Sequence, residues 1–168
     1  MHPDNLSMRL LTLLLAACLA PCAGAQQAGS VATPARDAAA IYIAQGNFII
    51  QRLGSECLTM VGRAESPETF AGTWRQRNAR YVEASAKYMD KRMDEAAAAG
   101  PDKREALLQE LRQAVQGNGE AALRGLLQGG KAQGCMYGVT LVDTGALDIN
   151  SKLPQYEQLE ALARWAAQ

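Results

Sequence analysis

Apolar residues recur at spacings of three, four and seven positions along most of the chain, which is the period of one face of an α-helix. The first such pattern predicts a helix over about 34–61. Thr33-Pro34 provides an N-cap followed by proline in the first helical position, and Gly62 ends the pattern. Because glycine weakens a helix interior, we expect a kink or a break at two pairs of residues, Gly46-Asn47 and Gly54-Ser55.

A second start signal, Ser66-Pro67-Glu68, precedes the longest predicted helix. The apolar face of this helix carries a series of aromatic residues at helical spacing, Phe70, Trp74, Tyr81 and Tyr88. The pattern continues to an alanine run without interruption. We therefore predict one long helix that ends at Gly100-Pro101.

Two shorter helices are predicted next. The first begins at Asp102, which forms a capping-box-like pair with Glu105, and it ends at Gly117. The second is capped by Asn118 and closed by Gly129-Gly130.

The segment 132–143 is ambiguous, because its β-branched residues favour a strand. An isolated strand would have no partner among helices, so we expect a helix, with the strand as the alternative. A loop over 148–153 and Pro154 precede the last predicted helix. Together these elements predict an all-α protein, a single-domain bundle of about five or six helices over residues 33–168.

The first 25 residues have the organisation of a secretory signal peptide. A positive charge at Arg9 precedes a short apolar run over 10–17, and Ala23-Gly24-Ala25 offers small residues for cleavage. A start at Met8 would give the same signal without its acidic leader. Residues 26–32 are small and polar, and we expect a disordered lead-in there.

A lipid anchor is the alternative to release after cleavage. Leu15-Ala16-Ala17-Cys18 is similar to a bacterial lipobox, in which the cysteine becomes the lipidated first residue. No other span of the sequence is apolar enough to cross a membrane. We therefore expect a periplasmic or secreted protein, or a lipoprotein anchored at Cys18.

Signal cleavage would leave two cysteines, Cys57 and Cys135, in an oxidising compartment, and we expect them to form a disulfide. In the chain-entropy model, closing a loop of this length stabilises the fold by about 4 kcal/mol. The single histidine, His2, lies in the signal segment, which argues against histidine-based catalysis, haem attachment and zinc binding. We expect neither a metal nor a cofactor.

The formal net charge is zero, so electrostatics give no reason to expect nucleic acid as a partner. Without histidine, acid–base catalysis would depend on carboxylates. Three of them, Asp143, Asp148 and Glu157, lie near predicted loops or helix ends and could converge with Glu65 or Glu68. Nothing in their spacing brings them together.

The densest polar cluster lies within the long predicted helix. Trp74, Arg77, Asn78 and Tyr81 fall on one side of that helix, because residues three and four positions apart are neighbours. Tryptophan, tyrosine and arginine are enriched at interface hot spots, which points to a binding surface. The alternative is an internal role, in which Trp74 and Tyr81 belong to the core while Arg77 and Asn78 brace a neighbouring helix.

An export signal, two cysteines and a Trp-x-x-Arg-Asn helix together resemble small exported helical proteins of bacteria, periplasmic immunity proteins among them. We expect a non-catalytic protein that binds another protein or an envelope component, as an inhibitor, an immunity-type protein or an envelope factor. Two alternatives stay open. One is a small-ligand or lipid-binding carrier with a pocket between helices, and the other is a carboxylate-based cell-wall hydrolase.

Overall fold

A computed structural model describes residues 31–168 of the chain, and all regular secondary structure in this part is helical, without a strand. Its elements are α1 (Pro34–Cys57), α2 (Pro67–Arg77), α3 (Ala79–Ala99), α4 (Pro101–Arg112), the π-helical turn η1 (Gln113–Gly117), α5 (Asn118–Leu126), α6 (Lys131–Asp143) and α7 (Tyr156–Ala166). The all-α prediction is confirmed, including the helix expected over 132–143. The predicted signal peptide, most of the lead-in and Cys18 lie outside the described residues.

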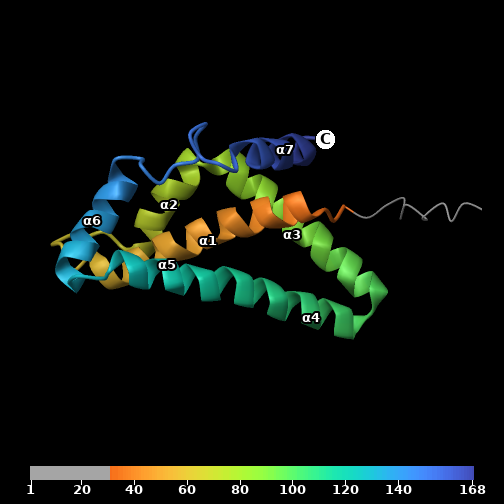
Figure 1. The fold of residues 1–168 in the computed structure, drawn as a ribbon, viewed down its shortest axis with the longest axis horizontal. Coiled ribbons are helices and arrows are strands. Elements are labelled where there is room, and N and C mark those ends of the chain that lie inside the picture. Colours follow the sequence, from red (N-terminus) through yellow and green to blue (C-terminus); the bar gives the residue numbers. More distant parts are fainter. Residues whose placement is uncertain (1–30) are drawn as a thin grey trace, which may run out of the picture. The chain divides into compact units, whose positions relative to one another are not determined.

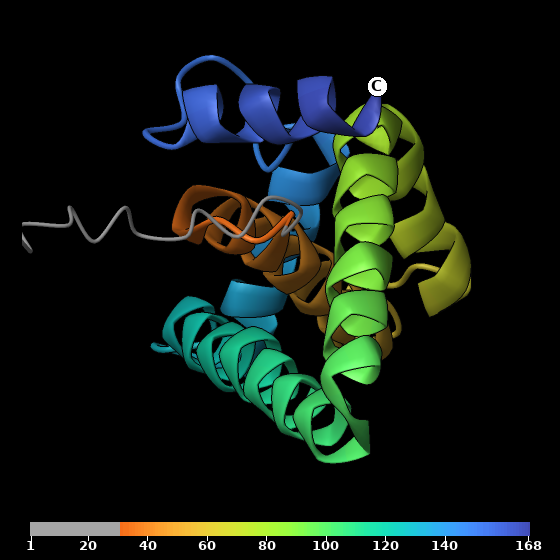
Figure 2. The ribbon, with the colours of Figure 1, turned by 90° about the vertical axis from the view of Figure 1, so that its right-hand side faces the viewer.

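Helix α1 is the centre of the bundle. It lies between α7 on one side and α4–η1–α5 on the other, and it also contacts α2, α3 and α6 (Figures 1 and 2). The C-terminal half of α1 carries one core cluster with α2, α5 and α6: Ile50, Leu53, Cys57, Leu58, Phe70, Ala71, Trp74, Leu123, Cys135, Val139 and Val142. The N-terminal half carries a second cluster with α3 and α7: Ala39, Ala40, Ile43, Tyr81, Ala84, Tyr88, Leu159, Leu162 and Ala163.

The break expected within the first helix is wrong, because α1 passes both glycine pairs and ends at Cys57. Close packing explains the glycine at position 54, whereas a Cβ at position 46 would make an ordinary van der Waals contact. A Cβ on Gly54 would lie 3.1 Å from the Cα of Pro67, and one on Gly46 would lie 3.5 Å from the Trp74 ring. The tertiary contacts of α2 outweigh a propensity cost of about 1 kcal/mol per glycine.

The single long helix predicted from Ser66 to Gly100 is also wrong, because it divides at Asn78 into α2 and α3. Asn78 has φ −108° and ψ 21°, outside the helical region. Its side-chain amide donates to the carbonyl of Trp74 at 2.9 Å, which is the local competition with the backbone that makes asparagine a helix breaker.

The helix boundary expected at Gly117 does not exist. Gly117 and Asn118 both have helical dihedrals, and Asn118 makes no side-chain cap, so the chain stays helical from Pro101 to Leu126. The bundle over 31–168 therefore consists of six helical rods, of which α4–η1–α5 is one. The capping pair expected at Asp102 is wrong too, since α4 begins after Gly100 without a side-chain cap.

Other predicted boundaries are confirmed. The hydroxyl of Thr33 accepts from the N–H of Arg36 at 3.2 Å, and that of Ser66 accepts from Thr69 at 3.1 Å. Gly100, with φ 134°, makes the turn between α3 and α4, and Gly130, with φ 139°, precedes α6. Positive φ at these turns explains why the helices end where glycine appears.

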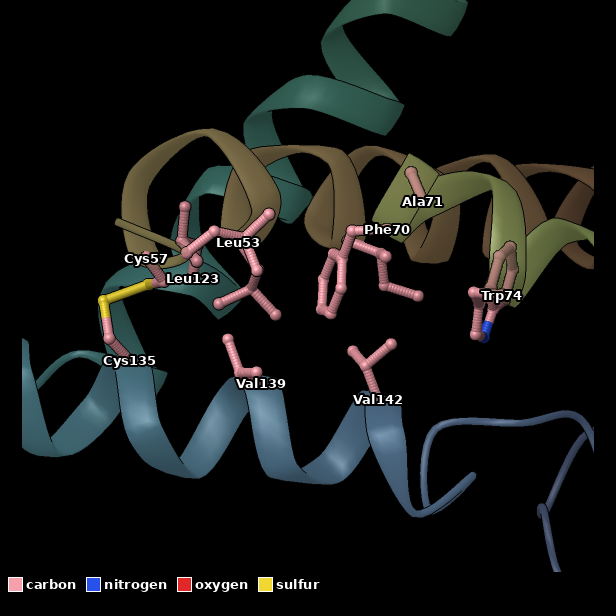
Figure 3. Packing of buried hydrophobic residues seen from close by; sticks show 11 residues of the cluster. Leu53, Cys57, Phe70, Ala71, Trp74, Leu123, Cys135, Val139 and Val142 are labelled. Atoms are coloured by element: carbon pink, nitrogen blue, oxygen red, sulfur yellow. A yellow bond between two sulfur atoms is a disulfide. The ribbon is translucent and has the colours of Figure 1, made fainter. Parts of the chain in front are cut away.

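The Cys57–Cys135 disulfide joins the last residue of α1 to the second turn of α6, across a separation of 78 positions (Figure 3). Leu53 and Phe70 face Val139 and Val142 beside it, so the covalent bond lies at one end of a packed apolar layer. The bond is consistent with an oxidising location outside the cytoplasm. Among residues 31–168, no helix combines the length and the apolarity that crossing a membrane requires.

Candidate functional site

Three of the four residues that the sequence singled out, Trp74, Arg77 and Asn78, contact the segment that leads from α6 to α7. Trp74 is only 2% exposed, and its indole Nε1 donates to the carbonyl of Leu147 at 3.0 Å. Asn78, also 2% exposed, accepts from the N–H of Ile149 at 2.8 Å and donates to Asp148 Oδ1 at 3.2 Å. Both polar atoms of the buried Asn78 amide are therefore hydrogen-bonded to the loop. These bonds join the α2–α3 junction to it.

Arg77 binds the same loop through its guanidinium group. Nε donates to Asp148 Oδ2 at 2.7 Å, and Nη2 donates both to Asp148 Oδ1 at 3.1 Å and to the carbonyl of Val142 at 2.6 Å. About a third of the Arg77 side chain (32%) remains exposed. The arginine therefore ties the end of α6 and the following loop to the end of α2.

Tyr81 lies farther along α3, facing α7. Its hydroxyl donates to Glu160 Oε1 at 2.5 Å, and Arg80 binds both carboxylate oxygens of Glu160 at 2.9 and 2.8 Å. The hydrogen bond from Tyr81, together with the Arg80 guanidinium, lowers the pKa of the Glu160 carboxyl. Burial and the bond to Glu160 raise the pKa of Tyr81, so both groups stay in the protonation states that bind each other.

All four side chains thus contact other parts of the same chain, as the internal alternative describes. Trp74, Asn78 and Tyr81 are buried, and the partly exposed guanidinium of Arg77 is bound to Asp148. These contacts account for the unusual presence of asparagine between two helices. Whether any of the four also contacts a partner stays a prediction.

Two of the candidate carboxylates converge on Arg63, which binds both Asp143, at 2.7 Å, and Glu65. Asp148 is bound to Arg77 instead. Glu68 lies at the start of α2, where its own backbone N–H and the Ser66 hydroxyl lower the pKa of its carboxyl. Within the described residues, no three acidic, cysteine or histidine side chains gather in a way that could hold a metal ion.

An open groove of about 240 Å³ lies where α1, α3 and α4–η1 meet. Six apolar side chains line it: Ala44, Phe48, Met89, Leu108, Leu111 and Val115. Arg112 and Gln116 complete the lining. The volume is below the range of about 300–1,000 Å³ typical of pockets for drug-sized ligands, so the groove suits a slender molecule.

The π-helical turn forms one end of this groove. The N–H of Asn118 bonds to Val115 instead of Ala114, the partner it would have in an α-helix, and the side-chain amide of Gln45 donates to the carbonyl of Ala114 at 2.8 Å. This bond fastens η1 to α1. Such π turns occur frequently at functional sites, because they displace the side chains that follow.

Helix α4 forms the outer wall of the groove and is weakly attached to the bundle. None of its residues is buried, and its neighbours are α3 and η1, at its two ends. In Figure 1 it returns from the far end of α3 toward the α5 end of α1, with α1 opposite. Segments with few buried apolar contacts are the ones that open locally at low cost in free energy.

Leu108, Leu111 and Val115 lie at helical spacing in the sequence, but this spacing alone does not indicate a groove. The position of Phe48 could have indicated the groove, because this residue lies outside the buried stripe of α1 that contains Ile43 and Ile50. An aromatic residue beside the main apolar stripe indicates a second packing surface.

A second surface feature is on the outer face of α6. Met136 and Tyr137 are 64% and 57% exposed, next to the disulfide-bonded Cys135. Large apolar side chains at this exposure contact little of their own chain. Methionine and tyrosine are both enriched in protein–protein interfaces.

Comparison of the chain with protein-family models, with curated proteins and with solved structures finds no match.

Proposed function

We propose that this chain is a non-catalytic binding protein of the cell envelope and that the groove between α1, α3 and α4–η1 holds a slender apolar ligand. The observation that carries the proposal is the groove itself, an open space lined by six apolar side chains from three helical rods. In the free protein these side chains are only half-buried. A ligand that covers these side chains removes their apolar surface from water, and this hydrophobic free energy stabilises the complex.

The predicted signal peptide and the disulfide support a periplasmic or secreted location, with a lipoprotein anchored at Cys18 as the alternative. A carrier of apolar molecules is useful in such a compartment, since these molecules dissolve poorly in water. Glu65, Asp143 and Asp148 are each bound to an arginine, and we propose no catalytic role for them.

Binding can be tested with N-phenyl-1-naphthylamine, an apolar dye whose fluorescence rises when it leaves water. We expect saturable binding by the wild type. Ala44→Leu fills part of the groove and should weaken binding at least fivefold, because Ala44 lines the cavity. The matched control is Ala106→Leu, the same change on the exposed face of α4, which should leave binding unchanged. Dye binding that is equal in all three proteins, or absent in the wild type, contradicts the proposal.

A protein partner is the second candidate, and the exposed Met136–Tyr137 pair favours it. Such a partner would be the target of an inhibitor or immunity-type protein. The test is capture from envelope extract by the wild type and by Met136→Ala/Tyr137→Ala, with Met60→Ala, another exposed methionine, as control. Loss of one stoichiometric protein in the double variant alone supports this function, and retention by all three proteins contradicts the role of α6.

A further inference from the structure

We infer that the ligand of the groove is a fatty acid, whose alkyl chain lies among the apolar residues and whose carboxylate binds Arg112. The inference rests on the proposed function and adds the chemical class of the ligand. Its basis is the combination of a lining that is otherwise uncharged with one guanidinium group. The apolar residues of the groove determine where an alkyl chain can lie. Arg112 determines which end group of the ligand is favoured.

Arg112 has no ion-pair partner in its own helix. The positions three and four residues away are Leu108, Gln109, Val115 and Gln116, none of which is acidic. Nor does its side chain form a hydrogen bond or ion pair with any other described residue. By contrast, the guanidinium groups of Arg63, Arg77 and Arg80 are all bound to carboxylates. The charge of Arg112 is therefore available to an anion at the groove.

The groups at this position match a carboxylate better than a phosphate. Gln116 follows Arg112 by four residues, so the two side chains are neighbours on one face of the rod, and both line the groove. One guanidinium fork and one amide N–H suit a monoanion with two oxygens. A phosphate dianion would leave a negative charge uncompensated.

The size of the groove agrees with a single chain. At about 240 Å³ it suits one alkyl chain better than a sterol or a lipid with two chains, and the polar residues of its lining are Arg112 and Gln116. Leu108 lies one turn before Arg112 and Val115 lies one turn after Leu111, so a chain extending from the guanidinium meets apolar side chains along the rod.

The test compares decanoate, decanol and decyl phosphate by isothermal titration calorimetry at low salt. The first two have the same chain length and differ in the charge of the end group. We expect the wild type to bind decanoate about twofold to fivefold more tightly than decanol, the range for an exposed ion pair. Arg112→Gln should abolish this preference, so that the ratio of the two affinities falls to about one. The matched control, Arg124→Gln, removes an exposed arginine of α5 outside the groove and should retain it.

The outcomes separate the inference from the proposed function. If decanol and decanoate bind equally to the wild type, or if Arg112→Gln keeps the preference, the carboxylate assignment is overturned while the apolar groove stands. Tighter binding of decyl phosphate than of decanoate overturns it in favour of a phosphate head group. If none of the three molecules binds, both the inference and the proposed function are wrong. Thermal unfolding followed by circular dichroism establishes that each variant is folded.

Discussion

Arg77 and Asp148, 71 positions apart in sequence, are joined by two hydrogen bonds, from Nε to Oδ2 at 2.7 Å and from Nη2 to Oδ1 at 3.1 Å. This fork is the geometry in which arginine and a carboxylate bind most strongly. Arg77 Nη2 also donates to the carbonyl of Val142. One side chain therefore holds both the end of α6 and the loop that leads to α7.

Arg77→Ala should lower the free energy of unfolding by about 1.5–3 kcal/mol, the range for hydrogen bonds to charged groups. Urea unfolding at neutral pH measures this difference. Arg77→Lys keeps the charge but cannot form the fork, and it should recover less than half of the loss. Full recovery by lysine would mean that charge alone, without the paired hydrogen bonds, holds the loop.

Asn78→Ala should lower the free energy of unfolding by about 1–3 kcal/mol, because it leaves the partly buried N–H of Ile149 without an acceptor. Asn78→Asp keeps that acceptor but places a second carboxylate beside Asp148, whose Oδ1 lies 3.2 Å from Asn78 Nδ2. We expect this variant to be less stable at pH 7 than at pH 5, since protonation relieves the repulsion. Equal stability at both pH values would contradict the close approach to Asp148.

Gly134→Ala should destabilise the protein by about 1–3 kcal/mol, the range for overpacking. A Cβ at this position would lie 2.7 Å from the carbonyl oxygen of Leu126 and 2.8 Å from the Cα of Leu127, and backbone moves aside less readily than a side chain. Gly125→Ala is the matched control. It meets nothing within 4 Å on exposed α5, and should stabilise the helix by about 0.5–1 kcal/mol. Thermal unfolding of both variants measures the contrast.

The network around Glu160 predicts a loss of stability in acid. The pKa of its carboxyl is lowered in the folded protein, so it stabilises the fold above the pKa of an unfolded glutamate, about 4.3. That contribution disappears as the pH falls from about 5 through the lowered pKa. Glu160→Gln should be less stable at pH 7 and should lose less stability between pH 5 and pH 3. Tyr81→Phe removes the hydrogen bond from Tyr81 to Glu160. Its loss of stability between pH 5 and pH 3, measured by urea unfolding, should lie between that of the wild type and that of Glu160→Gln.

Gly119→Ala should weaken dye binding in the groove. A Cβ on Gly119 would lie 2.5 Å from Cδ1 of the Phe48 ring, so the ring must move away from α5, and Phe48 lines the groove. The control is Gly117→Ala, a similar change two residues earlier, where a Cβ meets nothing within 4 Å. Fluorescence titration with N-phenyl-1-naphthylamine compares the two. Equal affinity in both variants would mean that Phe48 does not shape the bound state.

The sequence by itself determined the fold class, most helix boundaries and the disulfide. Helical periodicity, the caps at Thr33 and Ser66, and glycines at positive φ are local properties, because each acts within a few residues of the chain. The pairing of Cys57 with Cys135 also followed from the sequence, since removal of the predicted signal peptide would leave only these two cysteines, which can combine in one way.

Only the tertiary structure decided where α1 and α4–η1–α5 run without a break, and what Trp74, Arg77, Asn78 and Tyr81 contact. Gly54 stays helical because Pro67 packs against it, and Asn78 interrupts a helix because its amide reaches both Trp74 and Ile149. The groove likewise requires α1 to pack against α3 and α4–η1, which are distant from it in sequence. The physical reason is common to all: the free energy of contacts between distant segments exceeds the cost of about 1 kcal/mol per residue that local propensity imposes.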